Sequence, residues 1–196
     1  SAWEQLLFCE NALNHKDSVK YYGEIAIARF PERPLPYLVF CSVQYEEKEY
    51  AKAITTLKTG ESLAGSDRLK VEFYSLLAES YGKIGHLDMS DDYYIRSLKI
   101  DSLNVVVLNN YSYSLAVRGD NISKAISMSK FTIEKEPYNS TYLDTYAWIM
   151  YQSNNLAEAE KYIRRAIEYG GGTNPEILSH YGDILAKKGK TKDAIA

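Results

Sequence analysis

Residues 141–167 read TYLDTYAWIMYQSNNLAEAEKYIRRAI, two short amphipathic segments joined by a polar turn. The first segment spaces its large and small apolar residues as one face of a helix does, at Leu143, Tyr146, Ala147 and Met150. After the polar run 152–155 the second segment does the same, at Leu156, Ala159, Ile163 and Ala166. Small side chains such as alanine let a neighbouring helix come close. The two segments therefore predict a tightly packed helical hairpin.

The same hairpin pattern recurs along the whole chain at offsets of 34 to 37 residues. Its first half is repeated at Trp3-Leu6-Leu7-Glu10, Tyr37-Phe40-Cys41-Gln44, Tyr74-Leu77-Ala78-Tyr81, Leu108-Tyr111-Ser112-Leu115 and Leu178-Tyr181-Gly182-Leu185. Its second half is repeated at Ala53-x3-Leu57, Ser90-x3-Tyr94, Ala125-x3-Ser129 and Ala159-x3-Ile163. One such motif occurs in many helical bundles, but several complete units in phase predict a repeat architecture.

These helix–turn–helix units resemble the tetratricopeptide repeat, whose pattern is W-x2-L-G-x2-Y…A-x3-F…P. Pro31 and Pro137 stand at unit ends, where that family places proline. The resemblance covers essentially all 196 residues. It implies an all-α fold, a right-handed superhelix of antiparallel helix pairs with about eleven complete helices and no strand. The local sequences at residues 110–115 and 142–148 also resemble those of bacterial repeat proteins.

The repeat predicts one continuous array over residues 1–196, because each unit of a solenoid contacts its neighbours. We expect repeats at about 1–33, 34–70, 71–104, 105–139 and 140–174, with a truncated sixth at 175–196. Gly23 occupies a position where the family prefers an aromatic residue, so we expect thin packing there. The sixth repeat has only the start of a second helix, and self-association is one way to cover the apolar surface this would expose.

Composition argues against two classes of partner. The net charge is −3, and the lysines between 187 and 192 fit the negative end of a helix better than a nucleic-acid patch. No apolar run approaches the ~18 residues that span a bilayer, so direct membrane insertion is not expected. The compartment is not indicated, and both the bacterial cytoplasm and the cell envelope remain open.

Catalytic and metal-binding constellations are not visible in the sequence. The histidines are His15, His86 and His180, and we expect His180 to form a solvated pair with Asp183, three residues along the same helix. Two ligands fall short of the three or four that zinc requires. The glycines of 170–172 follow a helix and precede Pro175, which is the pattern of a helix cap and not of a phosphate loop. We therefore expect no enzyme activity and no cofactor.

Resemblance to the tetratricopeptide family implies a scaffold that binds a partner protein or peptide along a groove formed by the first helices. The alternative is a regulatory segment of a larger bacterial enzyme or transcription regulator. Arrays of this family that clamp chaperone carboxylates use lysine, asparagine and arginine, and only Asn110 matches here among Ser75, Glu79, Asn110, Thr141 and Thr145. We expect no such clamp.

Steps of 35 residues place equivalent groove positions of the last three repeats in rows. The rows are Asn109, Asp144 and Ser179; Asn110, Thr145 and His180; and Tyr113, Trp148 and Asp183, with Tyr151 and Gln152 one turn beyond. Aromatic anchors ringed by hydrogen-bonding groups are typical of binding hot spots. We expect this surface to bind a segment of basic character that meets Asp144 and Asp183. The alternative is that Tyr113 and Trp148 only fill the inner wall between helices.

Overall fold

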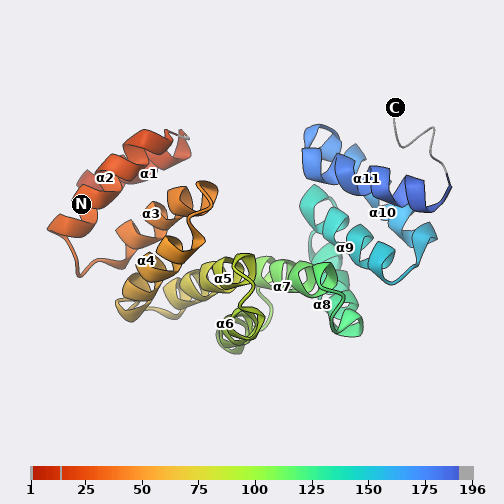
Figure 1. The fold of residues 1–196 in the computed structure, drawn as a ribbon, viewed down its shortest axis with the longest axis horizontal. Helices are drawn as coiled ribbons and strands as arrows, with labels where there is room; N and C mark the ends of the chain where they lie inside the picture. The colour runs from red at the N-terminus through yellow and green to blue at the C-terminus, as the bar shows by residue number, and fades with distance from the viewer. Residues whose placement is uncertain (1, 14, 190–196) are drawn as a thin grey trace. The chain divides into compact units, whose positions relative to one another are not determined.

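The computed structural model describes residues 2–13 and 15–189, and all regular structure in those ranges is helical (Figure 1). The helices are α1 (Ala2–Ala12), α2 (Lys16–Arg29), α3 (Pro34–Glu46), α4 (Tyr50–Ser62), α5 (Asp67–Lys83), α6 (Leu87–Ile100), α7 (Val105–Val117), α8 (Ile122–Lys135), α9 (Ser140–Gln152), α10 (Leu156–Glu168), the short 3-10 helix η1 (Gly171–Thr173) and α11 (Pro175–Lys187). The expected all-α fold built of helix pairs is confirmed. The expected second helix of the sixth repeat falls at 192–196, outside the described residues.

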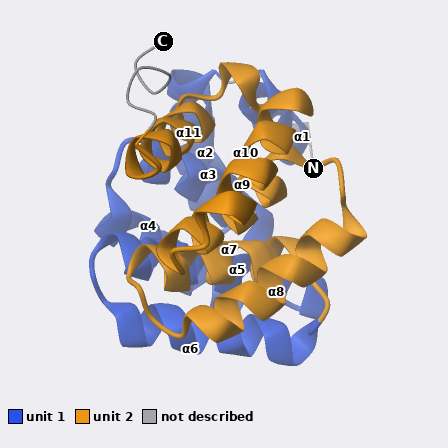
Figure 2. Ribbon diagram, turned by 90° about the vertical axis from the view of Figure 1, so that its right-hand side faces the viewer, with its two compact units in different colours: residues 1–102 blue, residues 103–196 orange. Residues whose placement is uncertain are grey.

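The chain divides into two compact units, which we call unit 1 (residues 1–102) and unit 2 (residues 103–196) (Figure 2). Unit 1 contains α1 to α6, and unit 2 contains α7 to α11. Within each unit consecutive helices pack against one another, and in unit 2 the middle first helix α9 contacts both α7 and α11. The division between the units, at 102/103, falls two residues before the predicted boundary between the third and fourth repeats, at 104/105. That both units belong to one continuous array stays a prediction.

The three first helices of unit 2 begin with the same capping residue. Asn104, Asn139 and Asn174 precede α7, α9 and α11, and each side-chain oxygen accepts a hydrogen bond from a backbone N–H of the first turn. Asparagine is among the strongest N-caps because it satisfies a donor that the helix leaves unpaired. The caps recur every 35 residues, so the three helices start in register with the repeat.

The turns after the first helices also share one backbone conformation. Lys48, Gly85, Gly119, Asn154 and Gly189 follow α3, α5, α7, α9 and α11, and all have positive φ. This left-handed conformation lets the chain reverse at once into the next helix. Glycine and asparagine tolerate it best, and Lys48 is the exception.

Packing at Gly23 differs from the expectation of a thin spot. Gly23 on α2 is buried, and a Cβ placed on it would lie 2.7 Å from Cδ2 of Phe40 on α3. The neighbouring helix therefore supplies the aromatic ring from the opposite side. Leu7, Val19, Ala26, Val39 and Val43 form the buried cluster beside it.

Candidate functional site: a polar and aromatic wall on unit 2

The predicted rows come together on α7, α9 and α11, and we call this surface the first-helix wall. It consists of Asn109, Asn110, Tyr113, Asp144, Thr145, Trp148, Tyr151, Glu176, His180 and Asp183. Four of the predicted residues are buried, namely Asn109, Asp144, Thr145 and His180. Asn110, Tyr113, Trp148 and Tyr151 are half-buried, and Asp183 is exposed. Only part of the predicted surface is therefore open to a partner in this conformation.

A buried histidine–carboxylate pair joins α9 to α11. His180 Nδ1 lies 3.0 Å from Oδ1 and 3.1 Å from Oδ2 of Asp144, and both side chains are 8% exposed. Burial raises the pKa of the Asp144 carboxyl above its ordinary value, against the opposing effect of the His180 hydrogen bond. The expectation of a solvated pair between His180 and Asp183 is wrong. The imidazole turns to α9, where it gains a carboxylate and an aromatic face, and Asp183 stays in solvent.

Four rings stand next to one another along the wall. The His180 ring stacks on Trp148 with centroids 4.1 Å apart, and Tyr113 lies on the α7 side at 6.2 Å from His180. Trp148 also stacks on Tyr151 at 4.8 Å, and Lys187 Nζ lies 4.3 Å from the Tyr151 centroid. Stacked rings of this kind hold their neighbours in fixed orientations. Tyr113 and Trp148 therefore pack within the inner wall, as the alternative drawn from the sequence has it, and their role in binding a partner stays a prediction.

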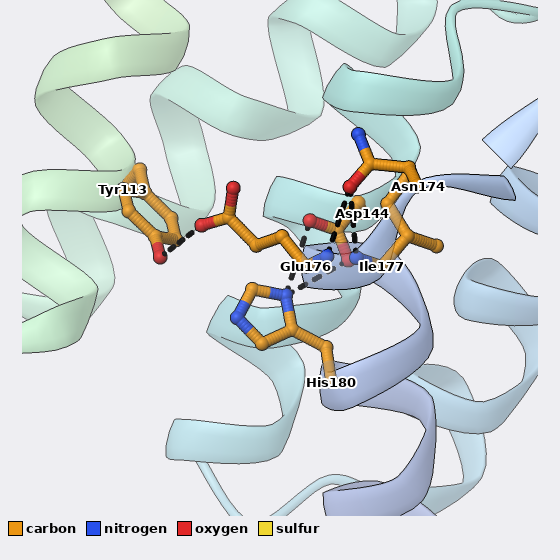
Figure 3. Close-up of polar contacts among 6 residues, drawn as sticks. All are labelled: Tyr113, Asp144, Asn174, Glu176, Ile177 and His180. Carbon is orange, nitrogen blue, oxygen red and sulfur yellow. Dashed lines mark hydrogen bonds and ion pairs between the residues drawn. The ribbon is translucent and has the colours of Figure 1, made fainter. Parts of the chain in front are cut away.

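A hydrogen bond also bridges the outer two helices of the wall (Figure 3). The Tyr113 hydroxyl on α7 donates to Oε1 of Glu176 on α11 at 2.8 Å. Glu176 is held in the first turn of α11, where its backbone N–H donates to the side chain of Asn174 at 2.9 Å. Burial, followed by the hydrogen bond to Glu176, raises the pKa of Tyr113. Glu176 itself is exposed.

Glu176 was missed by the sequence reasoning, although a signal was present. It belongs to a fourth row at the same 35-residue step, Val106, Thr141 and Glu176. It also stands one helical turn before His180 on α11, so the two share a face. Extending the rows by about one helical turn, three residues, toward the helix starts would have included it.

Two buried polar atoms of the wall have no hydrogen-bond partner among the residues that the structure describes. They are the side-chain oxygen Oδ1 of Asn109 and the indole Nε1 of Trp148. Asn109 is only 4% exposed, and its Nδ2 donates to Asn110 Oδ1 at 3.3 Å. Buried polar groups in folded proteins are nearly always paired, so each such atom calls for an explanation. Neither atom is exposed to solvent in this conformation, so an incoming molecule would reach them only if the surrounding side chains moved.

The described part of the chain contains no cluster of metal ligands and no membrane-spanning helix. In residues 2–13 and 15–189, no group of three or more histidine, cysteine, aspartate or glutamate side chains is placed to hold a metal ion. Within the same ranges no helix is both long and apolar enough to cross a bilayer.

The comparison with known sequences finds similarity to tetratricopeptide repeats. A family model described as tetratricopeptide repeat matches residues 71–102, close to the third predicted repeat. A curated tetratricopeptide repeat-containing protein of Pseudomonas aeruginosa is 26% identical over 147 residues. Residues 71–102 thus match a tetratricopeptide repeat, and the chain is similar to proteins of that family. The aligned region is 75% of this chain and 24% of the Pseudomonas protein, so the chain spans about a quarter of that relative's length.

Solved structures of tetratricopeptide proteins and of other helical assemblies show the same fold as this chain. A tetratricopeptide protein of Thermus thermophilus matches with a TM-score of 0.77 and 16% identity, over 94% of this chain and 98% of that one. PilW, described as a widely conserved type IV pilus biogenesis factor, matches with a TM-score of 0.81 and 17% identity, over 99% and 88%. A chain of the APC/C hetero-tetramer Cut9-Hcn1 matches with a TM-score of 0.85 and 12% identity, over 98% and 37%. At these identities the likeness concerns the fold, an α-α solenoid.

Proposed function

We propose that this chain is a non-catalytic scaffold whose first-helix wall binds an extended segment of a partner protein. The observation that carries the proposal is that the half-buried side chains of Tyr113, Trp148 and Tyr151 lie on the same wall as the exposed carboxylates of Glu176 and Asp183. Aromatic rings beside such groups are typical of interface hot spots. Together these features favour a protein segment over a small apolar ligand.

The charge of the wall favours a partner segment of basic character. Asp144 is engaged by His180 inside the wall, so it is not the acid that meets the partner in this conformation. Glu176 and Asp183 are exposed and take that role. The partner segment is still expected to be basic, but Glu176 replaces Asp144 as an acid that meets it.

Site-specific photocrosslinking tests this function. A benzophenone amino acid at Ser179, exposed on α11, should capture the partner in cells, and the same group at Ser127, exposed on α8, is the matched control. The captured protein is then purified and its affinity measured by calorimetry. Trp148→Ala should weaken binding by at least about 1 kcal/mol, whereas Tyr21→Ala, at a 62% exposed tyrosine of unit 1, should not. Equal crosslinking from both serines, or an unchanged affinity of Trp148→Ala, would refute the proposal.

A second function follows from the length of the Pseudomonas relative, of which this chain spans 24%. In a longer protein, the repeats would regulate an enzyme or transcription regulator that lies in the same polypeptide. The coding sequence on either side distinguishes the two functions, because a catalytic or DNA-binding module there would favour regulation.

A further inference from the structure

We propose that the first-helix wall recognises an arginine side chain of its partner, and that this arginine replaces the Tyr113 hydroxyl as the ligand of the Glu176 carboxylate. The inference rests on the proposed peptide-binding function and names the residue that the peptide must carry. It assigns the Tyr113–Glu176 bridge a role as an internal competitor that the partner displaces.

The bridge has the chemistry of a replaceable contact. A carboxylate offers about four acceptor positions, and the Tyr113 hydroxyl supplies one neutral donor to Oε1 of Glu176. A guanidinium supplies two parallel N–H donors and a full positive charge, and charge-assisted hydrogen bonds are about twice as strong as neutral ones. Because Glu176 is exposed, an incoming side chain reaches it without unfolding the wall.

The surroundings of Glu176 carry an excess of negative charge. Asp144 lies close enough that the Glu176 charge adds to the rise of its pKa, and both carboxylates raise the pKa of Tyr113. Asp183 stands two helical turns beyond Glu176 on α11 and is exposed. His180 is the one basic side chain bonded within this group in the described structure. A cation delivered to this position relieves the repulsion among the acids.

The aromatic side chains select arginine over lysine. A planar guanidinium stacks on aromatic faces and pairs with a carboxylate in two places, whereas an ammonium acts as a point charge. The chain already uses this contact internally, with Arg164 lying 5.2 Å from the Tyr181 centroid and Arg165 5.2 Å from that of Tyr162. Once released from Glu176, Tyr113 offers its ring to the arriving guanidinium.

A peptide-display selection against the 196-residue chain provides the probe. A random linear library is enriched on the wild-type chain, and two enriched peptides are synthesised for calorimetry. The enriched pool should contain a conserved arginine, and its replacement by lysine should weaken binding about 5-fold or more, because the bidentate contact is lost.

Two substitutions in the chain give opposite expected effects. Tyr113→Phe keeps the ring and removes the competing hydroxyl, so affinity should rise by about 2- to 10-fold, the range of one neutral hydrogen bond. Glu176→Gln should lower affinity about 10-fold or more because the charged acceptor is gone. Glu134→Gln, at an exposed glutamate of α8, is the control and should change nothing. Thermal unfolding of each variant checks that the fold is retained.

The possible results distinguish this inference from the proposed peptide-binding function on which it rests. Peptides that depend on Trp148 but carry no arginine would overturn the inference and leave the scaffold function standing. Weaker binding by Tyr113→Phe would do the same, because the hydroxyl would then be part of the site and not its competitor. Peptides that bind equally well to Trp148→Ala and Glu176→Gln would refute both. Sedimentation showing a second copy of the chain bound through this wall would also overturn the arginine assignment.

Discussion

At the scale of single residues, two histidine–carboxylate pairs of similar length differ in burial. His180 and Asp144 lie 3.0 Å apart with both side chains 8% exposed, whereas His15 and Glu10 lie 2.9 Å apart with 57% and 19% exposed. His180→Ala removes the donor from a buried carboxylate and should lower the free energy of unfolding by at least about 2 kcal/mol. His15→Ala should cost about 0–1 kcal/mol.

Urea unfolding followed by circular dichroism measures both variants. Asp144→Asn is a useful third variant, because it keeps an acceptor for His180 and removes the charge that burial disfavours. It should therefore cost less stability than His180→Ala. Equal losses in His180→Ala and His15→Ala would mean that the buried pair contributes no more than an exposed one.

The sequence identified most residues of the wall, but it did not identify their contacts. Rows at a 35-residue step correctly brought Asp144 and His180 to neighbouring helices, because equivalent positions of stacked repeats lie side by side. The rows could not show that His180 is buried, since burial depends on the ring of Trp148 beneath it. They also could not show the bond from Tyr113 to Glu176, which joins residues 63 positions apart across the middle helix. Side-chain reach decides such contacts, and repeat arithmetic gives only backbone positions.

At the scale of elements, the turn after α3 carries an unfavourable residue. Lys48 has φ of 62°, while the equivalent turns after α5, α7 and α11 use glycine. A side chain with a Cβ pays an energetic penalty in this conformation that glycine avoids. Lys48→Gly should raise the free energy of unfolding by about 0.5–1 kcal/mol. Lys52→Gly, inside α4, should lower it by about 1 kcal/mol, and denaturant melts of both variants check the sign. A loss of stability in Lys48→Gly would contradict this account of the turn.

Close packing of three helices in unit 1 depends on another glycine. A Cβ on Gly60 of α4 would lie 2.5 Å from Cε1 of Phe73 on α5 and 2.7 Å from Cβ of Tyr37 on α3. Gly60→Ala should therefore destabilise the chain by about 1–3 kcal/mol through overpacking, although alanine favours helix. Gly65→Ala has no atom within 4 Å of the new Cβ and should be close to neutral. If Gly60→Ala proved as stable as Gly65→Ala in thermal melts, the helices would not be in this close contact.

Helix boundaries were largely predictable because caps and turns are local. The sequence Gly65-Ser66-Asp67 predicts a capped helix start, and Ser66 Oγ accepts from Leu69 N–H at 3.3 Å. The helix α5 then begins at Asp67, four residues before the predicted repeat boundary at 71. The repeat motif marks packing positions inside the helix, so it does not register the extra first turn. The packing partner of Gly23 was likewise unpredictable, because Phe40 comes from the next repeat.

At the scale of the whole molecule, the sequence predicted the fold class because every repeat carries the same helical-hairpin pattern. The predicted boundary between the third and fourth repeats also lies close to the division between the two units at 102/103. Similarity to tetratricopeptide proteins indicates the general fold of this chain but not its partner. The Pseudomonas relative is about four times as long as the region it shares with this chain, so the partner of that protein does not transfer. The residues of the first-helix wall are what indicate the kind of partner segment that would bind.

Hydrogen–deuterium exchange with and without a saturating peptide from the display selection tests the central claim, that unit 2 binds a partner segment on its first helices. Amide exchange reports local opening, and a bound segment slows it where it docks. The account predicts slower exchange in α7, α9 and α11, with α2, α4 and α6 of unit 1 unchanged. Slowing confined to unit 1, or to the second helices α8 and α10, would contradict it.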